Sequence, residues 1–217
     1  MRARPVLVID YGMGNLGSVT RALEECGGSP RISSDPREIK NAPRVVLPGV
    51  GAFPDGMRNL KSRGIDDALG EQVLAKQVPF LGICLGMQLL STRGFEVEET
   101  PGLGWIEGDV KRLVPTAEDR RIPHVGWNEV HFAGAGAAAA ASAAAQALFN
   151  GVPSGKDFYF VHSFHLAPSD PKTVLAHTPY CGGFASAVHK DLIFGVQFHP
   201  EKSQKAGLQV LRNFLAV

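Results

Sequence analysis

The chain has little of several features that would place it in a specialised class of protein. Only three of its 217 residues are cysteines, with no C-x-x-C spacing, so we expect no disulfide framework and a free thiol suited to a reducing cytoplasm. The formal net charge is +1, so no overall field attracts nucleic acid or an acidic membrane. The apolar run at residues 6–9 is too short for the core of a signal peptide.

Long hydrophobic runs are also lacking. An uncharged stretch at residues 132–155 consists mostly of alanine and glycine, whereas a membrane span needs about 20 strongly apolar residues. We therefore expect no membrane span. Hydrophobic residues make up 44% and charged residues 20%, which is typical of a globular chain. Residues 1–217 are predicted to form a single domain, with an Ala-rich insertion at 133–147 that would be helical if ordered.

The first half of the chain alternates short apolar runs with segments of helical periodicity. Strands are predicted at residues 6–9, 29–33, 44–47 and 78–83. Helices are predicted at 15–26, from 36 onwards, and at about 55–76. This alternation predicts an α/β fold in which a mostly parallel central sheet has helices on both faces.

The second half of the chain changes character. Strands with short connections are predicted at residues 104–113, 125–132, 157–162, 173–177, 185–189 and 193–198. A closing helix is predicted at 203–215. Some of these strands should form a mixed extension of the sheet.

A thiol lies in the turn after the fourth predicted strand. Cys84 is flanked by Gly82 and Gly86, and this Gly-x-Cys-x-Gly pattern is the thiol counterpart of a nucleophile elbow. Glycines at both flanking positions relieve the crowding of so sharp a strand-to-helix turn. The first amides of the following helix would favour a thiolate. Taken alone, the pattern also suits a buried core cysteine at a tight turn.

A base and a carboxylate follow 115 residues later, at His199-Pro200-Glu201. His199 follows an apolar strand, so it should also lie at the carboxyl end of the sheet, where open α/β sheets place their ligands. Pro200 stiffens the link and lets Glu201 orient the imidazole. A nucleophile, a base and an orienting acid are the three parts of an acyl-transfer site, so together they favour a catalytic interpretation.

Two glycine-rich turns follow other strands. The loop Pro48-Gly49-Val50-Gly51 can aim backbone N–H groups at the site, and the amides of Val50 and Leu85 are the expected oxyanion donors. The turn at residues 12–17 matches G-x-G-x-x-G, but any tight βα turn attracts glycine, so we expect no nucleotide cofactor. The histidines show no metal-ligand pairing with the cysteines, so no metal is expected.

With these residues in view, the chain resembles the class I (triad) glutamine amidotransferases over nearly its whole length. Within them it is most similar to the glutaminase subunits of imidazole glycerol phosphate synthase. The closer match is carried by residues 10–16, 48–53, 123–128 and 159–163.

The resemblance implies a flavodoxin-like fold in which Cys84 attacks the side-chain amide of glutamine. It implies that His199 transfers the protons, that Glu201 supports the imidazolium, and that ammonia leaves. By similarity, glutamine is held by Gly49, Gly51, Gln88 and the main chain near His162 and Ser163. No cofactor is implied.

The resemblance also implies a partner, a (β/α)₈-barrel cyclase that receives the ammonia within a heterodimer. The cyclase would make imidazole glycerol phosphate and an aminoimidazole carboxamide ribotide in histidine biosynthesis. Gly49 and Gly51 permit a peptide flip that turns the Val50 N–H into or out of the oxyanion position. The sequence therefore predicts a weak resting glutaminase that is switched on when the cyclase holds its substrate.

Two alternatives stay open at this point. A free-standing Cys-His hydrolase, such as a γ-glutamyl peptidase of related fold, would need no partner. An inactive regulatory or binding module would keep the fold without the chemistry. Labelling of Cys84 by a glutamine-mimicking electrophile would argue against the binding module, because such a module should not react at this one thiol.

Overall fold

The computed structural model describes residues 4–132 and 147–217, so the predicted insertion at 133–147 lies outside it except for Ala147. Within these ranges the central sheet has nine strands in two parts. Five parallel strands lie in the order β2 (Gly28–Ser33), β1 (Arg4–Ile9), β3 (Val45–Gly49), β4 (Phe80–Cys84) and β13 (Ile193–Val196). Four antiparallel strands continue beyond β13 in the order β12 (Phe184–Lys190), β11 (Val174–Thr178), β8 (His124–Phe132) and β9 (Lys156–His162).

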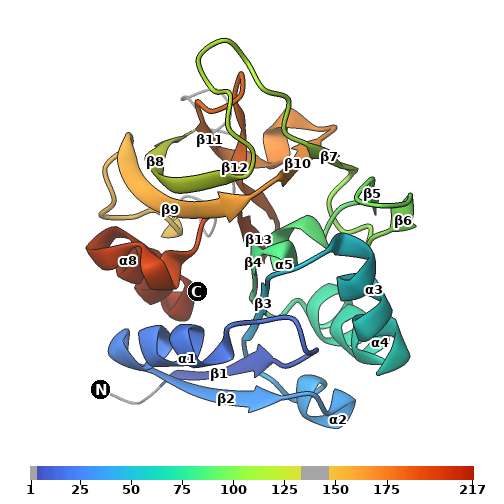
Figure 1. The fold of residues 1–217 in the computed structure, drawn as a ribbon. Coiled ribbons are helices and arrows are strands. Elements are labelled where there is room, and N and C mark those ends of the chain that lie inside the picture. The colour runs from blue at the N-terminus through green and yellow to red at the C-terminus, as the bar shows by residue number, and fades with distance from the viewer. Residues whose placement is uncertain (1–3, 133–146) are drawn as a thin grey trace.

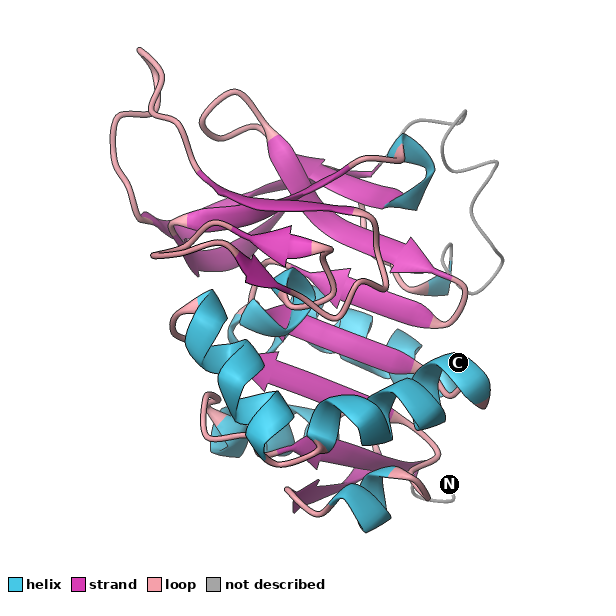
Figure 2. Ribbon diagram, turned by 90° about the vertical axis from the view of Figure 1, so that its right-hand side faces the viewer, coloured by secondary structure: helices cyan, strands magenta, loops and turns pink. Residues whose placement is uncertain are grey.

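The predicted fold class is therefore confirmed. The parallel part has the strand order of flavodoxin-like sheets, and the antiparallel part is the expected mixed extension. Helices cover both faces of the parallel part (Figure 1), whereas the antiparallel part is made mostly of strands and loops (Figure 2). The helices on one face are α1 (Leu16–Glu25) and α8 (Gln204–Ala216), and those on the other are α3 (Phe53–Ser62) and α4 (Ile65–Leu69).

The alternation of side chains along each parallel strand divides the core in two. On β1, Val6 and Val8 pack into the cluster that contains α1 and α8, while Leu7 and Ile9 pack into the cluster that contains α3 and α4. Successive side chains of a strand point to opposite faces, so a strand covered on both sides must be apolar throughout. This explains the continuous apolar runs in the sequence.

The helical stretch predicted at about 55–76 is interrupted. Gly64 adopts φ +63°, a left-handed conformation that ends α3 and precedes α4. A π-helical segment, Gly70–Ala75, then continues directly from α4. None of the helices in the described ranges has both the length and the apolar character that a membrane crossing requires.

A second sheet lies beside the first, in the order β10 (Phe164–Pro168), β7 (Gly108–Arg112), β5 (Arg93–Gly94) and β6 (Thr100–Pro101). The strand predicted at 104–113 belongs here rather than to the central sheet. The other three strands were not predicted, because two-residue strands have no periodicity and β10 follows β9 after a single residue.

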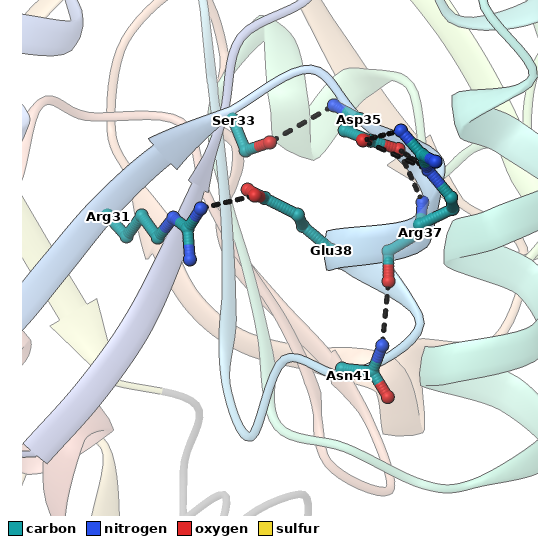
Figure 3. Close-up of polar contacts among 6 residues, drawn as sticks. All are labelled: Arg31, Ser33, Asp35, Arg37, Glu38 and Asn41. Atoms are coloured by element: carbon teal, nitrogen blue, oxygen red, sulfur yellow. Dashed lines mark hydrogen bonds and ion pairs between the residues drawn. The ribbon is translucent and has the colours of Figure 1, made fainter.

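Polar contacts fix the outer edge of the parallel sheet (Figure 3). Asp35 accepts a hydrogen bond from the Arg37 N–H at 2.9 Å, which caps the short helix α2, residues 36–39, and its carboxylate also pairs with the Arg37 side chain. Glu38 of this helix pairs with Arg31 of β2. Exposed ion pairs each stabilise a fold by about 0–1 kcal/mol, so this cluster secures the edge strand only modestly.

Candidate active site

The thiol sits on a strained turn. Cys84 is the last residue of β4 and the N-cap of the short helix α5 (Leu85–Gln88), with φ +54° and ψ −108°. A residue with a side chain seldom adopts a positive φ, and such strain gathers at functional sites. A Cβ on Gly82 would lie 2.5 Å from the Gly86 carbonyl oxygen, and one on Gly86 would collide with the Leu47 carbonyl oxygen. Both flanking positions therefore require glycine for close backbone approach.

Replacement of Gly86 by alanine should destabilise the fold, because the new methyl group meets backbone rather than a movable side chain. We expect a loss of about 2–5 kcal/mol in the free energy of unfolding, measured by urea denaturation. Gly17→Ala is the matched control: a Cβ there meets nothing within 4 Å, and the residue lies in α1. That variant should be unchanged or slightly more stable. Equal midpoints for the two variants would contradict this reading of the turn.

The sheet brings His199 to the thiol. β13 runs parallel to β4, with Val196 opposite Ile83, so the residues that follow the two strands emerge at the same edge. The backbone of His199 is held on both sides: its N–H donates to the Tyr159 carbonyl oxygen at 2.9 Å, and its own carbonyl accepts from the Ser203 hydroxyl at 2.6 Å. These two hydrogen bonds fix the backbone position from which the imidazole extends.

Glu201 completes a buried line of three groups. Its Oε1 lies 2.8 Å from His199 Nδ1, and its side chain is only 1% exposed. Burial alone would lower the pKa of His199, but the adjacent Cys84 and Glu201 outweigh burial and raise it to about 9. Nε2 of His199 makes no hydrogen bond of normal geometry within the described residues, although Cys84 is near enough to act on that pKa. Such contacts commonly tighten only when substrate binds.

The thiol opens onto a cavity of about 430 Å³. Most of the predicted site residues line it beside Cys84, namely Val50, Gly51, Leu85, Gln88, His162 and Ser163. His199 and Glu201 are buried and do not line it. Gly49 also lies outside the lining, where a Cβ would collide with the Tyr11 hydroxyl.

The two predicted oxyanion donors are not both available in this arrangement. The Val50 N–H donates to the Met13 carbonyl oxygen at 2.5 Å, so it is engaged by the turn at residues 12–17. The Leu85 N–H opens the first turn of α5, where helix amides have no partner within the helix. The glycine-rich turn at 12–17 thus packs against the Gly49–Gly51 loop.

The imidazole of His162 is fully engaged by other protein groups. Its Nδ1 donates to the Phe164 carbonyl oxygen at 2.8 Å, and its Nε2 lies 3.1 Å from Nδ1 of His124. Burial lowers the pKa of His162 to about 3 and that of His124 to about 4, so both rings are neutral. The ring of His162 is therefore occupied by protein partners, and a ligand contact through the main chain at His162 and Ser163 stays a prediction.

Two residues of the site were missed. Glu96 is half-buried, whereas its neighbours Glu98 and Glu99 are exposed; it lines the cavity and accepts from the Phe53 N–H at 2.8 Å. Gln197 is fully buried, with Nε2 3.6 Å from Cys84 Sγ. In the sequence it is marked only by its position two residues before His199. In the described part of the chain, no three His, Cys, Asp or Glu side chains are placed to hold a metal ion.

Comparison with known proteins defines the class. The family model for class I glutamine amidotransferases matches residues 7–217. The chain therefore belongs to this family.

Its relatives carry a more specific name. Over 211 residues the chain is 47% identical to imidazole glycerol phosphate synthase subunit HisH of Moorella thermoacetica, covering 97% of this chain and 94% of the relative. It is 44% identical over 220 residues to the subunit of the same name from Brucella abortus, covering 97% of each. A solved glutamine amidotransferase gives a TM-score of 0.72 at 16% identity, covering 97% of this chain and 99% of that one. PurLQS from Thermotoga maritima gives 0.71 at 17% identity, covering 99% and 98%, and both likenesses concern the fold.

Proposed function

We propose that this chain is the glutaminase subunit of imidazole glycerol phosphate synthase and acts in histidine biosynthesis. The identity to subunits of that name over nearly the whole chain supports the assignment. The observation that carries the chemistry is the buried pairing of His199 with Glu201 beside a strained thiol that faces a cavity. A free thiol of this kind suits a reducing cytoplasm.

The proposed reaction begins when Cys84 Sγ, as thiolate, attacks the amide carbon of glutamine. His199, as imidazolium, gives its Nε2 proton to the leaving nitrogen, so that the C–N bond breaks and ammonia departs. The remaining glutamyl thioester is attacked by water, whose proton returns to His199, and glutamate leaves as the thiolate is restored. Glu201 holds the ring through Nδ1 and balances the imidazolium charge.

The proposed substrate contacts follow from the cavity lining. Gln88, Gly51, His162 and Ser163 line the cavity beside the thiol, and we expect the side chain of Gln88 and the main chain of the other three to hold glutamine. Gly49 would act from outside the lining, where it packs closely against Tyr11 and Leu85. Glu96 adds a carboxylate at the same cavity, which suits the α-ammonium of a free amino acid.

The proposed partner is a cyclase with a (β/α)₈ barrel that receives the ammonia in a heterodimer. The Val50 N–H, held by Met13, suits a resting state in which the oxyanion site is half-built. Binding of the cyclase and its ligand would turn this amide to the oxyanion beside that of Leu85.

The test is glutamate release from glutamine, measured for this chain alone and then with the cyclase and its ribonucleotide substrate. We expect weak activity alone and strong activation in the complex, both lost in Cys84→Ala. Equally high activity without any partner would instead indicate a free-standing hydrolase. No hydrolysis in the complex would indicate that the fold is used without its chemistry.

A further inference from the structure

A buried glutamine links the thiol to a residue of the cavity wall. Gln197 follows β13, is fully buried, and has its main-chain N–H bonded to the Ser186 carbonyl oxygen at 2.9 Å. Its Nε2 lies 3.6 Å from Cys84 Sγ, and its Oε1 accepts from Gln88 Nε2 at 3.0 Å. Gln88 Nε2 also donates to the Phe164 carbonyl oxygen at 2.9 Å.

A backbone carbonyl fixes the orientation of both side-chain amides. The Phe164 carbonyl oxygen can only accept, so the Gln88 atom that meets it must be the NH₂ group. The other hydrogen of that NH₂ then requires the oxygen of Gln197, which turns the NH₂ of Gln197 to the sulfur. Gln88 thus donates to both Phe164 and Gln197, and Gln197 in turn donates to Cys84.

We propose that Gln197 is a further catalytic residue of this site, donating through Nε2 to the Cys84 thiolate while its Oε1 positions Gln88. This rests on the proposed function for what the thiolate attacks. The Nε2 hydrogen bond should stabilise the thiolate of Cys84 more than the neutral thiol, because a hydrogen bond to an ionised acceptor is about twice as strong as one between neutral groups.

The acceptor half of Gln197 acts on the substrate end of the site. Both hydrogens of the Gln88 amide are used, by Phe164 and by Gln197, so only its Oε1 is left for the cavity. Gln88 is therefore set to accept from a donor group of the ligand, such as an ammonium. Loss of Gln197 would free Gln88 to rotate and present either end.

The test uses Gln197→Met, which keeps the side-chain volume and removes both polar atoms. The donor role and the acceptor role are then followed by two separate measurements. The donor role is measured as the rate at which iodoacetamide alkylates Cys84, followed on the Cys84 peptide by mass spectrometry. We expect this rate to fall about 10-fold, and kcat for glutamate release in the assembled complex to fall about 10- to 100-fold. The acceptor role should appear as a raised KM for glutamine.

Gln72→Met is the matched control. Gln72 is also a buried glutamine, 4% exposed, and its Nε2 donates to the Ala42 carbonyl oxygen away from the cavity. It should lose stability without changing the alkylation rate or KM. If Gln197→Met does not fold, Gln197→Asn serves in its place, because it stays polar but is one methylene too short for both contacts.

Unchanged alkylation and KM in the Gln197 variant, or equal losses in Gln72→Met, would overturn the proposal. A wild-type complex that hydrolyses no glutamine would refute the proposed function instead, and the alkylation rates would still decide the role of Gln197.

Discussion

Glu201→Gln is expected to lower kcat for glutamine hydrolysis by about 10³- to 10⁴-fold and to shift its pH dependence. The carboxylate is buried against His199 Nδ1 and helps to raise the pKa of His199 to about 9 against the opposing effect of burial. The imidazolium needed to protonate the leaving nitrogen is therefore present below pH 9 and is lost as the pH rises through that value. Wild-type activity should fall on the alkaline side near pH 9.

In Glu201→Gln the negative charge is gone, so the alkaline fall in kcat/KM should move down by about 1 unit or more. The amide can also turn its NH₂ towards Nδ1 and select the unproductive tautomer, which accounts for most of the loss in kcat. Glu98→Gln, an exposed carboxylate on the loop after Glu96, is the control and should leave the profile unchanged. An unshifted alkaline limb in Glu201→Gln would mean that another group holds the proton on His199.

The sequence predicted those parts of the site that are formed by motifs of a few consecutive residues. Gly82 and Gly86 are needed because a side chain at either position would collide with nearby backbone. For Gly82 this backbone is four residues away, at Gly86, and for Gly86 it is Leu47 of the adjoining strand. His199 and Glu201 are two residues apart on one turn, so their 2.8 Å contact is also local. That both segments follow buried strands was enough to bring them together, because parallel strands end at one edge of the sheet.

The parts that were missed depend on long-range contacts. Gln197 contacts residues 109 and 113 positions away in the sequence, and the contact of Glu96 with Phe53 spans 43. No periodicity encodes such pairs, and a buried polar residue looks in sequence like an exposed one. The second sheet was missed for a related reason, since β5 and β6 are defined only by their neighbours.

The hydrogen bond between the Val50 N–H and Met13 suggests how a low resting rate of glutamine hydrolysis can be kept without any change at Cys84, His199 and Glu201. Cys84 and His199 follow two adjacent parallel strands, and the imidazole already contacts the Glu201 carboxylate. The loop that carries Val50 is held instead by the separate turn at residues 12–17. The proposed control by the Val50 peptide group can therefore be tested apart from the proposed catalytic groups.

Gly51→Val is expected to abolish activation by the cyclase. Gly51 adopts φ +114°, which a β-branched residue does not tolerate, and a Cβ there lies 2.7 Å from Met13 Cε. Valine therefore disfavours the conformation in which the Val50 N–H is bonded to Met13, and the loop should lose the two-state exchange that brings this amide to the oxyanion. One such donor is worth about 10²- to 10³-fold in kcat, so the ratio of glutamate release with and without ligand-bound cyclase should fall by that factor.

Gly64→Val is the control for backbone strain alone. Gly64 also has a positive φ, +63°, but it lies between α3 and α4 with nothing within 4 Å of an added Cβ. Both variants should lose thermal stability, whereas only Gly51→Val should lose activation, because only that loop carries an oxyanion donor. Unchanged activation in Gly51→Val would show that the Val50 amide does not need to move, and the resting level of activity would then require a different cause.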